Sequence, residues 1–85
     1  MGLTRRILEV VLERAADAHA TRVTAVHIEI GEESDVSPLS IDLYWPEVSR
    51  STAAEGARLY FANAADPYAF RLAGIDVEET VPTRT

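Results

Sequence analysis

The sequence predicts an α+β fold of the two-layer α/β sandwich type, in which two helices cover one face of a three-stranded mixed sheet. Apolar residues recur every three or four positions in two segments, and they alternate with polar residues in three others. Helices and half-buried strands of this kind bury their apolar sides by packing as two layers. With 85 residues, 47% of them hydrophobic, we expect one small core and a single domain over residues 1–85.

The first helix is expected over residues 4–19. Thr4 is the expected N-cap, because a threonine hydroxyl can accept from the free N–H groups of a first helical turn. His19 falls in the expected last turn, where a cation complements the helix dipole, so we assign it a structural role. The helix period is carried by Ile7, Leu8, Val11, Leu12, Ala15 and Ala18.

The first strand is expected over residues 22–30, a segment rich in β-branched residues that ends at Gly31. Its residues alternate, so one set faces the core and the other faces solvent. The core set is Val26, Ile28 and Ile30, and the solvent set is Ala25, His27 and Glu29.

A second helix is expected to begin at Ser37 and Pro38, which suit the N-cap and the first turn. Ile41, Trp45 and Val48 follow at helical spacing and predict a second apolar stripe on the same core. At this spacing Trp45 is interpreted as a core residue rather than as part of a partner-binding patch with Tyr44. Pro46 removes a backbone donor, so we expect a kink or an early tightening there.

The second half of the chain predicts a turn and two more strands. Residues 52–56 have capping-box spacing followed at once by glycine, which favours a single helical turn that then reverses. Alternation predicts strands over residues 57–62 and 72–81, separated by a turn-rich segment at residues 63–68.

Charge and composition restrict the partners. The net charge of −6 argues against nucleic acid and anionic membranes. The sequence has no cysteine, no signal-peptide pattern and no apolar run of transmembrane length, so the expected location is the cytoplasm.

Four blocks of this sequence carry a family resemblance. Residues 22–32 contain Arg-Val-Thr-x-Val-x-Ile-x-Ile-Gly-Glu, Val36-x-Pro38 follows, residues 52–59 contain Thr-x-Ala-Glu-Gly-Ala-x-Leu, and residues 74–77 are Gly-Ile-Asp-Val. Together, and without gaps between the first three, they resemble the nickel-binding domain of the HypA/HybF family of hydrogenase maturation proteins. The resemblance implies a nickel metallochaperone fold and function.

The resemblance also implies two metal sites whose ligands this sequence lacks. Family members bind nickel through a Met-His-Glu start, which supplies the planar nitrogen ligands that Ni(II) favours. This sequence starts Met1-Gly2-Leu3. The family zinc ribbon needs paired Cys-x-x-Cys motifs, and here residues 63–70 serve only to turn the chain back. We therefore expect a HypA-like domain without the ribbon, and no cofactor.

The remaining candidates for metal binding are weak. His27 and Glu29 share the polar face of the first strand, but neither has a further ligand at suitable sequence spacing. Glu32, Glu33 and Asp35 form an acidic loop of the kind that is usually just solvated.

Patterns typical of catalysis are not found. The sequence contains no glycine-rich phosphate loop, no thiol and no serine in a nucleophile elbow. Glu78 and Glu79 are neighbours on a strand, so they face opposite sides and cannot share a substrate. We expect a protein that is not an enzyme.

These observations favour function through protein–protein binding. The leading hypothesis is a metal-free HypA-like accessory protein or small subunit that binds a nickel-enzyme subunit or a maturation factor. Tyr60, Tyr68 and Phe70 are the candidate partner-binding residues, since aromatic side chains are enriched at binding hot spots. Two alternatives stay open: a nickel metallochaperone whose native N-terminus is not represented, and a homo-oligomeric structural protein.

Overall fold

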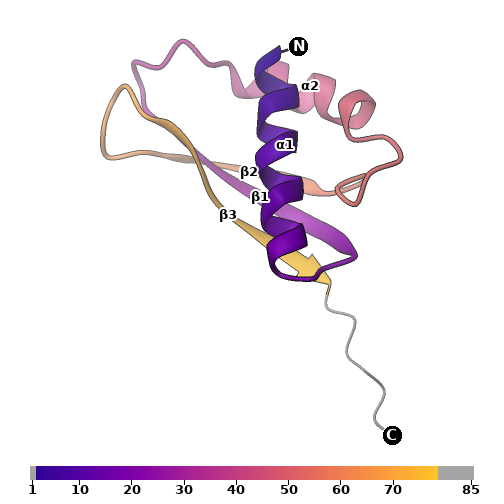
Figure 1. Ribbon diagram of the computed structural model, residues 1–85. Coiled ribbons are helices and arrows are strands. Elements are labelled where there is room, and N and C mark those ends of the chain that lie inside the picture. The colour runs from indigo at the N-terminus through magenta and orange to yellow at the C-terminus, as the bar shows by residue number, and fades with distance from the viewer. Residues whose placement is uncertain (1, 79–85) are drawn as a thin grey trace, which may run out of the picture.

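The computed structural model describes residues 2–78 and confirms the predicted fold class. Its elements follow the order α1 (Gly2–Asp17), β1 (Arg22–Ile30), α2 (Pro38–Val48), β2 (Arg58–Asn63) and β3 (Phe70–Glu78). The sheet has the strand order β2-β1-β3, with β1 parallel to β2 and antiparallel to β3. A mixed three-stranded sheet with β1 at its centre results (Figure 1).

Both helices pack against one face of this sheet. The alternation of β1 directs its β-branched residues to that face, where they meet the apolar stripes of the two helices. The largest fully buried apolar side chains of this core are Val11 of α1, Val23, Val26 and Ile28 of β1, and Ile41 of α2. Trp45 belongs to the same cluster and is only 3% exposed, which confirms its interpretation as a core residue.

Helix α1 differs from the prediction at both ends. It begins at Gly2, and Thr4 lies inside it as a buried residue, so the predicted N-cap at Thr4 is wrong. The reason is that Thr4 shares the core-facing stripe with Ile7, Leu8 and Val11, so the buried side of the helix starts at a threonine.

His19 lies beyond the end of α1, so the prediction that it falls in the last helical turn is wrong. Its φ of 56° is left-handed, its N–H donates to the carbonyl of Ala16 at 3.0 Å, and the N–H of Ala20 donates to the carbonyl of Ala15 at 2.9 Å. This pair of bonds is the Schellman motif, which satisfies the last free carbonyls of a helix. His19 therefore has a structural role, as expected, but through its backbone.

Helix α2 has the predicted start. The Ser37 hydroxyl accepts from the N–H of Ser40 at 3.3 Å, and Pro38 occupies the first turn. Pro46 does not end the helix, which continues to Val48. Ser49 is the C-cap, and both its N–H and its hydroxyl donate to the carbonyl of Trp45.

Residues 52–56 form a series of turns instead of the single helical turn that the capping-box spacing predicts. Thr52 stabilises the first of these turns through its side chain. Its hydroxyl donates to the Ser49 carbonyl at 2.6 Å and accepts from the N–H of Ala54 at 3.1 Å. The chain reverses at Gly56, whose φ is 81°, as expected of a glycine at this position.

Strand β3 begins at Phe70, earlier than the predicted start at residue 72. Phe70 pairs with Ile30, so it belongs to the sheet and not to the turn. The turn between β2 and β3 therefore comprises residues 64–69. The predicted end of this strand at Val81 lies outside the described residues.

Candidate functional site

The sheet face away from the helices carries a row of polar and aromatic side chains, and we call it the open face. Register places His27 of β1 beside Tyr60 of β2 and Gly74 of β3. The same face carries Ala25 and Glu29 of β1, Arg58 of β2, and Arg71 and Asp76 of β3. No helix of residues 2–78 covers it, so its exposed side chains are available to a partner. Ala25 is the exception: it was predicted to face solvent, but it is only 6% exposed because its short side chain lies low between the neighbouring strands.

His27 lies at the centre of the open face and contacts a residue from each outer strand. Its Nε2 lies 3.0 Å from Oδ2 of Asp76 on β3. Its ring stacks on that of Tyr60 on β2, with ring centroids 5.2 Å apart and an angle of 14° between the planes. His27 therefore has partners on both sides, although its side chain remains 43% exposed.

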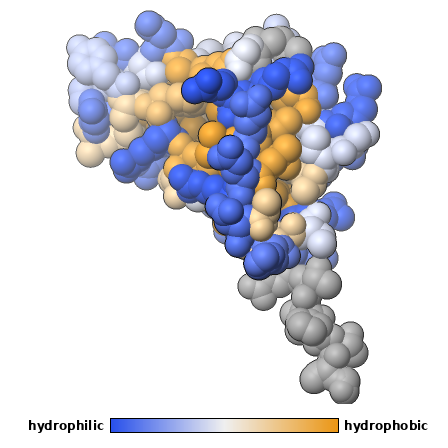
Figure 2. All heavy atoms as spheres, viewed as in Figure 1, coloured by the Kyte–Doolittle hydropathy of each residue, from blue (hydrophilic) through white to orange (hydrophobic). Residues whose placement is uncertain are grey.

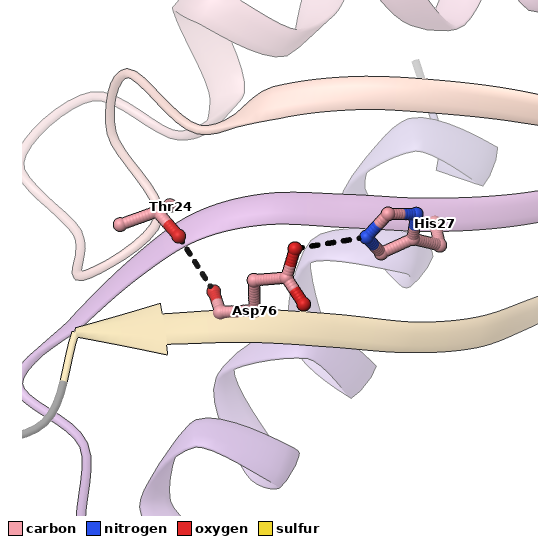
Figure 3. A network of polar contacts seen from close by, with 3 residues as sticks. All are labelled: Thr24, His27 and Asp76. Atoms are coloured by element: carbon pink, nitrogen blue, oxygen red, sulfur yellow. Dashed lines mark hydrogen bonds and ion pairs between the residues drawn. The ribbon is translucent and has the colours of Figure 1, made fainter.

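Asp76 pairs with Ala25 and is therefore the diagonal neighbour of His27, in a short stretch of the β1–β3 ladder that has a register shift at each end. The pairing shifts between Val23 and Ala25, so Thr24 is an extra residue that has no partner in the ladder. The Thr24 hydroxyl donates to the backbone carbonyl of Asp76 at 3.2 Å, and the Asp76 carboxylate points along the sheet toward His27 (Figure 3).

Gly74 leaves room for this pair. It is the residue of β3 directly opposite His27, and a Cβ placed on it would have no other heavy atom within 4 Å. The position opposite His27 is therefore open, and the imidazole reaches diagonally to Asp76.

Glu29 is occupied by another partner. Its Oε1 accepts from Nη2 and Nε of Arg71 at 2.6 and 2.7 Å. His27 and Glu29, the weak metal candidates, therefore share a face but contact different residues of β3. In the part of the chain that the structure describes, no group of three or more His, Asp or Glu side chains could hold a metal ion.

The predicted partner-binding residues are not brought together. Tyr60 is 47% exposed on the open face, and Tyr68 is 74% exposed in the turn at residues 64–69. Phe70 faces the other way, is half-buried and packs against the core beneath the helices. Asp76, which orients His27, was missed by sequence reasoning because 49 residues separate the two and only the irregular register aligns them.

Fold and face together define a small α+β protein with a pre-ordered polar surface. Residues 1–68 match the family described as "Hydrogenase/urease nickel incorporation, metallochaperone, hypA". That match covers well over half of the chain, and the protein belongs to the HypA family. A metallochaperone family is not a family of enzymes, which confirms the prediction that the protein is not an enzyme.

Curated relatives agree with this assignment. The chain is 34% identical over 65 residues to the hydrogenase maturation factor HypA of Aeromonas hydrophila, covering 76% of this chain and 58% of that protein. It is 40% identical over 60 residues to HypA of Pectobacterium atrosepticum, covering 71% of this chain and 51% of that protein. The chain thus spans little more than half the length of these relatives.

The fold is shared with a solved family member. The solution structure of the Ni metallochaperone HypA from Helicobacter pylori superimposes with a TM-score of 0.79 at 12% sequence identity, covering 89% of this chain and 94% of that chain. This likeness shows the fold. Strand β3 lies beyond the residues matched by the family model, so Phe70, Arg71 and Asp76 are not part of that match. Neither helix of residues 2–78 is long and apolar enough to cross a bilayer.

Proposed function

We propose that this protein assists nickel incorporation into a hydrogenase or urease as a docking component, by binding a protein partner through the open face. The observation that carries the proposal is the stack of Tyr60 on His27, which in turn contacts Asp76. Membership of a nickel-incorporation family supports the pathway, and the exposed, ordered aromatic supports the mode of action.

Physical reasoning favours Tyr60 as the anchor of such an interface. Aromatic side chains contribute most when they enter a partner's pocket, and binding loses less entropy when their rotamer is already restricted. The imidazole beneath Tyr60 restricts its ring, and the Asp76 carboxylate restricts the imidazole. Exposed Arg58 and the Arg71–Glu29 pair surround the stack with charges that can set orientation.

A complementation experiment tests the proposal. In a strain that lacks this gene, we expect nickel-dependent hydrogenase or urease activity to fall, and the wild-type gene to restore it. Tyr60→Ala should fail to restore activity at equal protein abundance. Tyr44→Ala is the matched control, because Tyr44 is an exposed tyrosine of α2 that is remote from the open face. Unchanged activity of both nickel enzymes in the deletion strain would contradict the proposal.

A second candidate function is nickel carriage with ligands outside residues 2–78. The family description favours it, and so does the length of the curated relatives, of which this chain spans little more than half. Calorimetric titration with Ni(II) separates the two candidates. A one-to-one site of submicromolar affinity would favour carriage, whereas weak, non-stoichiometric binding together with loss of complementation by Tyr60→Ala would favour docking.

A further inference from the structure

A groove of about 500 Å³ lies between α1 and β3, on the sheet face opposite the open face. One of its walls is the outer flank of α1, and the sheet forms its floor. The apolar lining residues are Leu3, Ile7 and Val10 of α1 together with Ile28, Phe70 and Leu72 of the sheet. Arg6 and Arg14 line the same groove from α1. Arg71 of β3 is a further lining residue, but its guanidinium group is already paired with Glu29.

The groove exposes apolar surface that the fold itself does not cover. Leu3 is 42% exposed and Val10 is 38% exposed. Both lie outside the buried stripe of α1, at positions where polar residues are usual. Figure 2 shows apolar surface beside the polar outer ridge of α1. Apolar surface gathered in a hollow and bordered by charge is typical of a binding site.

The two arginines of α1 point to the charge of the occupant. Within residues 2–78, neither Arg6 nor Arg14 has an ion-pair partner, whereas Arg71 is paired with Glu29 on the open face. In a chain with a net charge of −6, two unpaired guanidinium groups on one apolar groove form a local positive field. Guanidinium groups bind carboxylates by charge-assisted hydrogen bonds, so the groove suits an acidic ligand.

Spacing indicates the conformation of that ligand. Arg6 and Arg14 are eight residues apart on a helix, which corresponds to about 12 Å along the axis. An extended chain covers about 13 Å in four residues, and the residue midway between them points to the same side. Strand β3 is an edge of the three-stranded sheet, so an extended segment can lie alongside it.

We propose that this groove binds an extended acidic segment of a partner protein, with two carboxylates four residues apart and an apolar side chain midway between them. The carboxylates contact Arg6 and Arg14, and the apolar side chain enters between Val10 and Phe70. This surface lies on the other side of the sheet from Tyr60, and the proposal does not depend on the function proposed for the open face.

A synthetic peptide tests the chemistry directly. The probe is a fluorescent peptide with the repeating order Glu, Thr, Leu, Thr, Glu, and its binding is measured by anisotropy at low salt. We expect saturable one-to-one binding to the wild-type chain, weakened at least tenfold by Arg6→Glu with Arg14→Glu. A peptide with Lys in place of Glu should bind that double variant better than the wild type.

Matched variants distinguish peptide binding in the groove from a general effect of net charge on binding. Arg5→Glu with Arg50→Glu changes the net charge equally but alters arginines that do not line the groove, and it should retain wild-type affinity within twofold. Amide NMR signals of residues 70–72 should shift on peptide addition, while that of Tyr60 should not. Circular dichroism checks that each variant is folded.

Three outcomes would overturn the proposal. The first is equal weakening by the two double variants. The second is no saturable binding of the Glu peptide to the wild type at millimolar concentration. The third is a different occupant: self-association of the wild type that Arg6→Glu with Arg14→Glu abolishes, or binding to anionic lipid vesicles without binding to the peptide.

Discussion

His27 and Tyr60 stack ring on ring across the parallel β1–β2 pair, with 5.2 Å between the ring centroids. The stack lies on the sheet face that no helix of residues 2–78 covers, and Asp76 contacts the imidazole from the opposite strand. Three strands therefore contribute one side chain each to a single ordered cluster. The register of the three strands therefore determines the relative positions of these side chains.

The His27–Asp76 pair should contribute little to stability. Both side chains are substantially exposed, at 43% and 63%, and exposed ion pairs contribute about 0.2–1 kcal/mol. We expect Asp76→Ala to lower the free energy of unfolding by less than about 1 kcal/mol, as measured by urea denaturation. In a double-mutant cycle of Asp76→Ala and His27→Ala, the coupling energy between the two residues should also be below about 1 kcal/mol. A coupling several times larger would show that the cluster stabilises the fold instead of preparing a surface.

Gly31 should be one of the least replaceable residues of the fold. A Cβ at this position would collide with the backbone of Asp66 and Pro67, which crosses directly over it. The same contact holds the β2–β3 turn, because the Gly31 N–H donates to the Ala69 carbonyl at 2.8 Å and the Glu33 N–H to the Pro67 carbonyl at 2.6 Å. Backbone atoms cannot rotate away as a side chain can.

Gly31→Ala should therefore lower the free energy of unfolding by about 2 kcal/mol or more, as expected of overpacking against a rigid neighbour. Gly74→Ala is the matched control, since open space surrounds its Cβ position and alanine suits a strand better than glycine. Thermal and chemical unfolding of both variants measures the difference. Equal stability of the two would mean that the turn shifts to accommodate the methyl group.

Local patterns predicted the elements because each pattern depends on neighbours in sequence. Alternation placed Val26 and Ile28 on the core face and His27 on the other, and helical spacing placed Ile41 and Trp45 in the core. The start of α1 was mispredicted because Thr4 can serve either as a cap or as a core residue, and only the position of the sheet decides between them.

The candidate site was predicted only in part, for a related reason. The outward orientation of Tyr60 follows from strand alternation, but the contact of His27 with Asp76 depends on the pairing of residues 25–27 with 74–76, which has a register shift at each end. A register shift has no short-range signal in the sequence. The groove beside α1 likewise arises only when the helix is placed on the sheet.

His19 offers a test of the C-terminal cap of α1. Its left-handed backbone is less strained in glycine than in any other residue, although histidine tolerates it better than most. We expect His19→Gly to raise the free energy of unfolding by about 0.5–1 kcal/mol, and His19→Val to lower it by about 1 kcal/mol or more. Urea denaturation of the two variants measures both changes in the free energy of unfolding. Destabilisation by glycine would indicate that the imidazole contributes more than its backbone does.

Nickel binding by residues 1–85 should be weak. The sequence contains no cysteine, and residues 2–78 hold no group of three or more potential ligands. Calorimetric titration with Ni(II) at neutral pH should show no stoichiometric site of submicromolar affinity. His27→Ala should leave the titration unchanged, and a loss of tight binding in that variant would instead place a site on the open face.

Truncation of Tyr68 and of Phe70, two residues apart, should change the free energy of unfolding by very different amounts. The Tyr68 side chain is 74% exposed, so Tyr68→Ala should change the free energy of unfolding by less than about 0.5 kcal/mol. Phe70 packs against the core, so Phe70→Ala should cost about 2–4 kcal/mol, near the lower part of the range for buried phenylalanine. Thermal unfolding of each single variant measures these effects. The groove peptide should bind Phe70→Ala less tightly, provided that the variant remains folded, and bind Tyr68→Ala as it binds the wild type. If Phe70→Ala kept wild-type stability and Tyr68→Ala lost it, the turn and not the strand would close this end of the core.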